Sequence, residues 1–233
     1  HPNSLILGIL WSIAIEEQYY LSWPLLLSFL PLRYFKHACI VILVGSLIFR
    51  FIHHDQPDVL YFNTFAVIGD MALGGLLAYY VSFPNKFQQF ISNLGWPGVL
   101  GIYAGAIGFS LFKENIFTCG IPVIFERLVI GLFFGLIILE QNYARGSLFK
   151  LGKSKALSKL GIYTYGLYCL HLLGMYAAVR VVVKLGWPQD NLWVALASAL
   201  LALAASIIIS IGSYHVFEKW FLQLKNRFAF ITR

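Results

Sequence analysis

The chain has 233 residues, of which 59% are hydrophobic and only 12% charged, and its formal net charge is +7. Soluble domains carry about 25% charged residues, so the charges here are too few to cover the surface of a soluble helical bundle. Apolar runs of about 20 residues instead match the thickness of a bilayer's hydrocarbon core. The composition therefore predicts an all-α, multi-pass integral membrane protein.

Run length and turn-forming residues predict about seven transmembrane helices in a single membrane domain over residues 1–233. In chain order, the predicted spans are Leu5–Leu30, His37–Ile52, Val59–Ser82, Trp96–Phe112, Ile121–Glu140, Ile162–Lys184 and Leu192–Phe217.

Basic residues alternate between the connections that join these spans. The connection after the fifth span holds Arg145, Lys150, Lys153, Lys155 and Lys159, whereas HHDQPD and GWPQDN hold no Lys or Arg. Basic connections face the cytoplasm, so the pattern predicts an N-terminus outside and a C-terminus in the cytoplasm. This topology accounts for the net charge without a nucleic-acid partner. The lysine cluster is alternatively a site for acidic lipids or for the phosphates of a nucleotide-bearing donor.

Two adjacent acids, Glu16 and Glu17, lie in the middle of the first predicted span. A charge at the bilayer centre costs roughly 2.5–3.5 kcal/mol on insertion scales, and such residues usually face a cavity and have a function. Ser12, Glu16 and Tyr20 recur every four residues and so share one helix face. The alternative for the two acids is an interhelical hydrogen bond.

Asp70 and His171 lie at a similar predicted depth in the third and sixth spans. Together with the two glutamates they predict one polar site inside the bundle. The alternatives are a bond from Asp70 to a neighbouring helix and a structural role for His171. Three arginines near the outer ends of spans either extend toward head groups or form an anion subsite: Arg50, Arg127 and Arg180.

The stretch WSIAIEEQYYLSWPLLL resembles the signature span of the acyltransferase 3 family of membrane O-acyltransferases. The matching residues are Trp11, Ser12, Glu16, Glu17, Gln18, Tyr19, Tyr20, Trp23 and Pro24. LGIYTYGLYCLHLL is similar to the family's Ser-Tyr-Gly-Leu-Tyr…His segment, with Thr164 in place of Ser. SYHVFEKWFLQLK is similar to its closing segment, but Lys219 and Trp220 replace Arg and Pro, so the planar Arg fork is lost. GDMALGGLLAYY resembles the Gly-Ala-rich helix between them.

The resemblance implies a fold of about ten spans in the bacterial inner membrane. It also implies transfer of an acyl group, often acetyl, from acyl-CoA to a hydroxyl of a cell-envelope carbohydrate or a lipid-linked acceptor. The family's catalytic motif places a basic residue eleven positions before a His, and no His of this chain has Arg or Lys there. That motif is therefore expected before His1, which makes this chain the C-terminal two-thirds of the domain. No bound cofactor or metal is expected.

By the same resemblance, Glu16 and Glu17 are the expected catalytic carboxylates. One of them would orient or charge-stabilise a catalytic His that deprotonates the acceptor hydroxyl. The expected substrate-binding residues are Trp11, Ser12, Gln18, Tyr20, Asp70, Arg127, Tyr165 and His171. Two other interpretations stay open, namely a proton-coupled transporter and a truncated, non-catalytic fragment.

Overall fold

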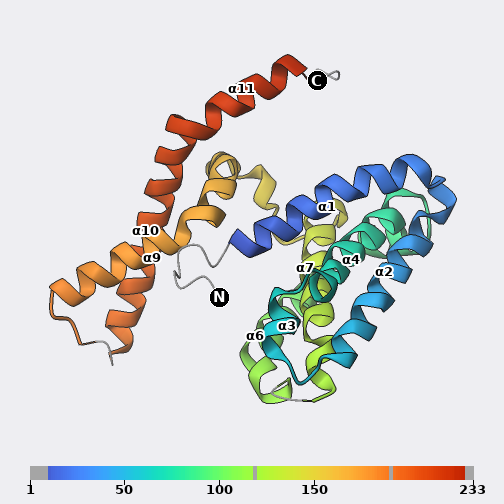
Figure 1. The fold of residues 1–233 in the computed structure, drawn as a ribbon, viewed down its shortest axis with the longest axis horizontal. Helices are drawn as coiled ribbons and strands as arrows, with labels where there is room; N and C mark the ends of the chain where they lie inside the picture. The colour runs from blue at the N-terminus through green and yellow to red at the C-terminus, as the bar shows by residue number, and fades with distance from the viewer. Residues whose placement is uncertain (1–9, 118–119, 189–190, 229–233) are drawn as a thin grey trace. The chain divides into compact units, whose positions relative to one another are not determined.

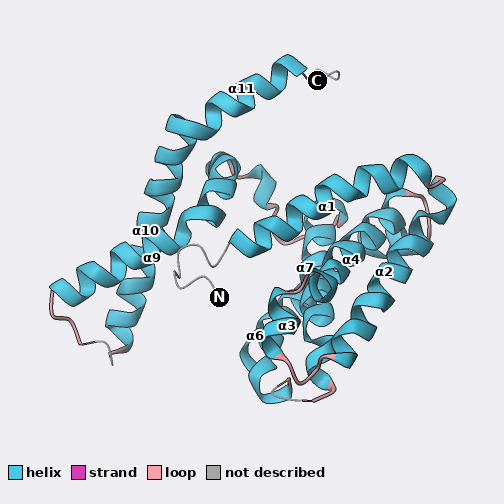
Figure 2. Ribbon diagram, viewed as in Figure 1, coloured by secondary structure: helices cyan, strands magenta, loops and turns pink. Residues whose placement is uncertain are grey.

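The computed structural model describes residues 10–117, 120–188 and 191–228. In these residues the chain is helical, with no strand among them (Figures 1 and 2), which confirms the all-α prediction. Five of the described helices are long and apolar enough to cross a membrane, and a sixth if one bent pair counts as a single span. The protein is therefore a multi-pass membrane protein.

The helices form two compact units, the first of which is Trp11–Leu151. Its helices are α1 (Leu10–Phe29), α2 (Leu32–Ile52), α3 (Pro57–Phe62), α4 (Thr64–Ser82), α5 (Lys86–Ser92), α6 (Trp96–Ile116) and α7 (Pro122–Tyr143). The second unit contains the residues from Gly152 onward. The single membrane domain expected over residues 1–233 stays a prediction.

Three of the predicted spans differ from the helices of the first unit. Val59–Ser82 is broken at Asn63, whose backbone is extended and whose side chain accepts a hydrogen bond from the Phe65 amide, so that it caps α4. The fourth span, Trp96–Phe112, lies within α6, which continues to Ile116 and meets the preceding α5 at a bend of 94°. The first span is helical from Leu10, and residues 5–9 lie outside the described residues. The described α1 is not among the helices apolar enough to span, because acids, an amide and tyrosines interrupt its apolar run.

Helix α4 lies at the centre of the first unit and packs against α2 on one side and α7 on the other. Small residues allow the close approach to α2. A Cβ placed on Gly69 would lie 2.8 Å from Ser46 Oγ, and that hydroxyl donates to the Ala66 carbonyl at 3.2 Å. This contact sets the orientation of α4 against α2, and with it the position of Asp70, the residue after Gly69 along the helix.

The second unit is built around an antiparallel pair of long helices. Its elements are the 3-10 turns η1 (Leu151–Lys153) and η2 (Gly161–Tyr163), α8 (Lys155–Leu160), α9 (Thr164–Lys184), α10 (Leu192–Ser213), the π-helix η3 (Tyr214–Glu218) and α11 (Lys219–Phe228). Figure 1 shows α9 and α10 side by side. Helices α10 and α11 continue each other through η3, and the helical segment Leu192–Leu224 is 33 residues long and contains a strongly apolar stretch.

Small and hydroxyl residues hold α9 against α10. Ser206 Oγ donates to the His171 carbonyl across the interface at 3.2 Å, and Ser210 Oγ donates to the Tyr163 carbonyl at 2.7 Å. Gly174 faces Ser206, so the two backbones approach closely. Packing of this kind is how membrane helices associate where lipid removes the hydrophobic driving force.

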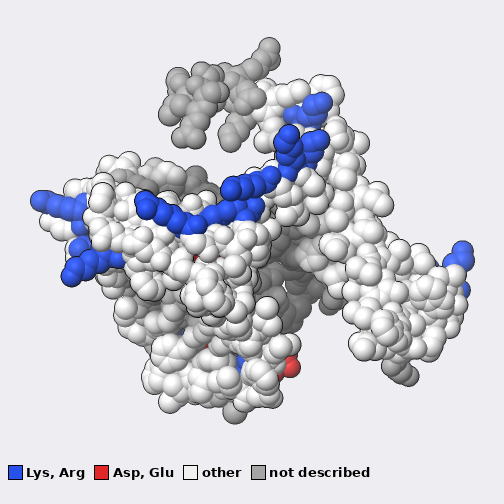
Figure 3. Space-filling view, turned by 180° about the vertical axis from the view of Figure 1, so that it is seen from behind, with Lys and Arg blue, Asp and Glu red and all other residues white. Residues whose placement is uncertain are grey.

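The protein's surface reflects its positive charge. On the face that Figure 3 shows, lysine and arginine side chains are plentiful and acidic ones are scarce. In the second unit, Lys153, Lys155 and Lys159 of η1 and α8 are all exposed.

Candidate functional site

One face of α1 packs against the beginning of α4 and the short helix α3. The Trp11 ring lies with its centroid 4.9 Å from Tyr61 and 5.2 Å from Phe62. One turn further, Ile15 is buried, and Gln18 Oε1 accepts a hydrogen bond from Thr64 Oγ1 at 3.2 Å. Positions 11, 15 and 18 follow the spacing of one helix face. Two of the predicted substrate-binding residues, Trp11 and Gln18, therefore hold α1 in place.

The two predicted catalytic acids lie beside this packing face. Glu16 is half-buried and Glu17 is exposed. Within the described residues, neither carboxylate forms an ion pair. Ser12 is half-buried and Tyr20 is 61% exposed. The part of α1 that carries the acids is thus left open by the helices of the first unit.

Asp70 on α4 and Arg127 on α7, which are 57 positions apart in sequence, form an ion pair. Arg127 Nε donates to Asp70 Oδ2 at 2.9 Å, and Nη2 donates to the same oxygen. Within the described residues, Oδ1 of Asp70 accepts no hydrogen bond. The two side chains are 32% and 30% exposed, so the pair lines an open space.

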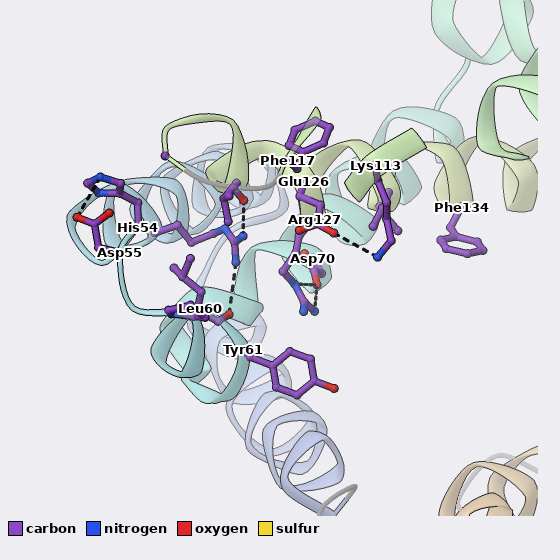
Figure 4. Close-up of a pocket in the computed structure, with 16 residues that line it drawn as sticks. His54, Asp55, Leu60, Tyr61, Asp70, Lys113, Phe117, Glu126, Arg127 and Phe134 are labelled. Atoms are coloured by element: carbon purple, nitrogen blue, oxygen red, sulfur yellow. Dashed lines mark hydrogen bonds and ion pairs between the residues drawn. The ribbon is translucent and has the colours of Figure 1, made fainter. Parts of the chain in front are cut away.

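That space is a cavity of about 830 Å³ between α2, α3, α4, α6 and α7 (Figure 4). Its lining is mixed, with charged groups and aromatic rings: Arg50, His54, Asp55, Pro57, Leu60, Tyr61, Asp70, Lys113, Phe117, Gly120, Val123, Glu126, Arg127, Ile130, Gly131 and Phe134. A second ion pair, Lys113 Nζ to Glu126 Oε1 at 3.4 Å, lies on its wall. Tyr61 connects the cavity to α1, because it lines the cavity and its ring contacts that of Trp11 in a tilted arrangement.

Arg50 holds the walls of the cavity together. Arg50 as a whole is only 3% exposed, and its guanidinium donates to the carbonyls of Ile124 at 2.9 Å, Val123 at 2.8 Å and Leu60 at 3.5 Å. It therefore ties α2 to the start of α7 and to α3. Neither alternative given for Arg50, extension toward head groups or an anion subsite, fits this arrangement, because backbone carbonyls take its donors. Arg180 is exposed and lies 6.0 Å from the centre of the Tyr176 ring.

The remaining predicted site residues, Tyr165 and His171, lie on α9 of the second unit. His171 is half-buried, and its Nδ1 lies 2.8 Å from the Tyr168 carbonyl. Tyr165 is 60% exposed. Within the described residues of both units, no three His, Cys, Asp or Glu side chains gather into a group that could hold a metal ion.

The family model for the acyltransferase domain matches residues 1–211. The chain belongs to the acyltransferase 3 family. The peptidoglycan O-acetyltransferase OatA of Listeria monocytogenes serovar 1/2a (strain ATCC BAA-679 / EGD-e) is 25% identical over 225 residues, which cover 90% of this chain and 34% of that protein. The chain thus spans about a third of the length of this curated relative. No solved structure matches it.

Membership of the acyltransferase 3 family confirms the resemblance that the signature stretch indicated. In this family member, the signature helix α1 rests on α3 and α4 through Trp11 and Gln18. Tyr61 contacts Trp11 of this helix and also lines the cavity that contains Asp70 and Arg127. Glu16 and Glu17 are not among the residues that line it.

Sequence reasoning missed a buried polar network at the far end of α7 in this acyltransferase 3 chain. Glu140 is fully buried, and its Oε2 accepts hydrogen bonds from Tyr103 Oη at 3.1 Å and Gln141 Nε2 at 2.8 Å. Lys150 Nζ donates to the carbonyls of Glu140 and Gln141, both at 2.7 Å. Lys150 therefore caps the C-terminus of α7 and is not simply one charge of a topogenic cluster. The sequence signal that could have indicated this network is Glu140 itself, an acid in the last turn of a predicted span.

Proposed function

We propose that this acyltransferase 3 chain belongs to a membrane O-acyltransferase that moves an acyl group, acetyl in the simplest case, from acyl-CoA to a hydroxyl group. The proposed acceptor is a cell-envelope carbohydrate or a lipid-linked sugar, and the proposed location is the bacterial inner membrane. The name of the relative, a peptidoglycan O-acetyltransferase, supports both the acetyl group and the envelope acceptor. The alternating basic connections support an N-terminus outside and a C-terminus in the cytoplasm.

One observation carries the proposal. The signature helix α1 is held by Trp11 and Gln18 against α3 and α4, and both of these helices contribute residues to the lining of a polar cavity. The half-buried Glu16 and the exposed Glu17 remain outside that packing. Neither carboxylate forms an ion pair within the described residues. Each is therefore free to interact with the side chain of a catalytic base.

The reaction needs a base, an electrophile and a leaving group. A His base takes the proton of the acceptor hydroxyl, and the oxygen attacks the carbonyl carbon of the thioester. The tetrahedral oxyanion then collapses, the C–S bond breaks, and coenzyme A leaves as a thiol after protonation. In this scheme, Glu16 or Glu17 orients the imidazole and stabilises the imidazolium, as an acid does in other base-assisted acyl transfers.

Replacing Glu17 by glutamine in the full-length protein is expected to lower acyl transfer by about 100-fold, because the amide keeps the shape but no longer stabilises an imidazolium. The measurement is label transfer from radioactive acetyl-CoA to envelope carbohydrate in membranes. Glu114→Gln is the matched control, since this acid is exposed on α6 and does not line the cavity. Normal transfer by the Glu17 variant would remove the proposed role from that residue.

The transporter interpretation makes a different prediction in the same membranes. A proton-coupled carrier would move its substrate without any acyl-CoA, whereas a transferase modifies its acceptor only when the donor is supplied. Membership of the acyltransferase 3 family favours the transferase.

A further inference from the structure

The cavity of the first unit is charged but electrically balanced. Its lining holds three cations, Arg50, Lys113 and Arg127, and three acids, Asp55, Asp70 and Glu126. Arg50 donates its hydrogen bonds to backbone carbonyls, and the other two cations are each paired with an acid. A phosphate group entering this space would have to displace a carboxylate from its cationic partner. The displaced carboxylate would then be left without a counter-charge, which costs free energy. The balance disfavours a polyanionic ligand such as coenzyme A.

The same ion pair retains unused hydrogen-bonding capacity of both kinds. Arg127 directs Nε and Nη2 to a single oxygen of Asp70. Within the described residues, Asp70 Oδ1 accepts no hydrogen bond and Arg127 Nη1 donates none. A carboxylate oxygen is an acceptor and a guanidinium nitrogen is a donor, whereas a hydroxyl is both. One hydroxyl can therefore donate to Asp70 and accept from Arg127 without breaking the pair.

Aromatic rings supply the other half of such a site. Tyr61 and Phe134 line the cavity and are 55% and 63% exposed (Figure 4). The Tyr61 ring contacts Trp11 and Phe62, each at a centroid distance of 4.9 Å, and these contacts restrict its movement. Flat ring faces cover the C–H face of a saccharide, while the charged pairs satisfy hydroxyls at its edge.

We propose that this cavity is the subsite for a neutral, polyhydroxylated ring of the acceptor. The ring would pack against Tyr61, and one of its hydroxyls would hydrogen-bond to both Asp70 and Arg127. The inference rests on the proposed function for the identity of the acceptor. The volume of about 830 Å³ lies within the range of about 300–1,000 Å³ typical of small-molecule sites. The donor's phosphates bind elsewhere.

The test is a binding experiment on the full-length protein in lipid nanodiscs without any acyl-CoA. The probe is chitotetraose, a neutral tetramer of N-acetylglucosamine, and the readout is saturation-transfer NMR of the sugar protons. We expect saturable binding with a Kd of about 1 mM, weakened about tenfold by Tyr61→Leu and by Asp70→Asn. Tyr34→Leu is the matched control, because Tyr34 is an exposed tyrosine of α2 outside the cavity, and it should bind normally.

The inference would be overturned by no saturable signal up to about 10 mM sugar, by displacement of the sugar by an equal concentration of coenzyme A, or by equal binding of all variants. A polyanionic saccharide that binds more tightly than the neutral tetramer would also overturn it. Because no donor is present, the outcome is separate from the transfer reaction. Sugar binding without any acyl transfer in membranes would keep this subsite and reject the proposed function.

Discussion

Replacing Gly174 by alanine is expected to destabilise the second unit by about 3 kcal/mol, at the upper end of the usual cost of overpacking. A Cβ at this position would lie 2.7 Å from the backbone nitrogen of Ser206 and 2.8 Å from its Cα. These are backbone atoms, so no rotamer change relieves the clash and α9 must move away from α10. The movement also stretches the hydrogen bond from Ser206 Oγ to the His171 carbonyl.

Thermal unfolding of the detergent-solubilised protein measures this effect, with an expected decrease in Tm of about 6–12 °C. Gly212→Ala is the matched control on α10, because a Cβ there meets nothing within 4 Å. Alanine is the better helix former, so the control should be neutral or slightly stabilising. Equal Tm values for the two variants would mean that the α9–α10 interface tolerates wider spacing than the structure shows.

Replacing Arg127 by leucine is expected to cost about 2 kcal/mol of stability, less than the 3–5 kcal/mol of a fully buried pair because each partner is about one-third exposed. It should also lower acyl transfer by about 100-fold or more. The leucine leaves the Asp70 carboxylate without its cation in the membrane domain and removes a hydrogen-bond donor from the cavity.

A charge swap, Asp70→Arg combined with Arg127→Asp, separates the two roles of the pair. The swap restores the attraction between α4 and α7, so the Tm should largely recover. Donor and acceptor exchange places in the cavity, so transfer should stay low. Recovery of both quantities would show that the pair is only structural, and a swap that rescues neither would place its main role in the backbone geometry of α4 and α7.

Helix positions could be predicted well from the sequence because run length in a membrane protein is a direct physical constraint. The break at Asn63 was missed because the apolar residues continue on both sides of it. The signal was present in the residue itself, since asparagine before a helical run is a favoured N-cap.

Pairing across helices could not be predicted in the same way. Asp70 and Arg127 were each expected to bind substrate, but only the packing of α4 on α7 shows that they contact each other. Arg50 was harder still, because its partners are backbone carbonyls, which every sequence contains. The buried Glu140 was read as the end of a span because its partner Tyr103 lies on a different helix, α6.

The continuous helical segment from α10 through η3 to α11 is longer than a bilayer is thick. Its 33 residues extend about 50 Å at 1.5 Å per residue, against about 30 Å of hydrocarbon. The surplus must leave the hydrocarbon or tilt, and the exposed Trp220 and Phe221 beside Lys219 suit the head-group region.

Glu218, just before α11, accepts a hydrogen bond from Ser213 at 3.1 Å, and its Oε1 lies 2.6 Å from where a Cβ on Gly166 of α9 would be. A change in hydrophobic mismatch that pulls on α11 therefore reaches the helix that carries Tyr165 and His171. We therefore expect the thickness of the host membrane to affect the packing of α9 and α11. Lipids of different chain length should change the protein's thermal stability even when their head groups are identical.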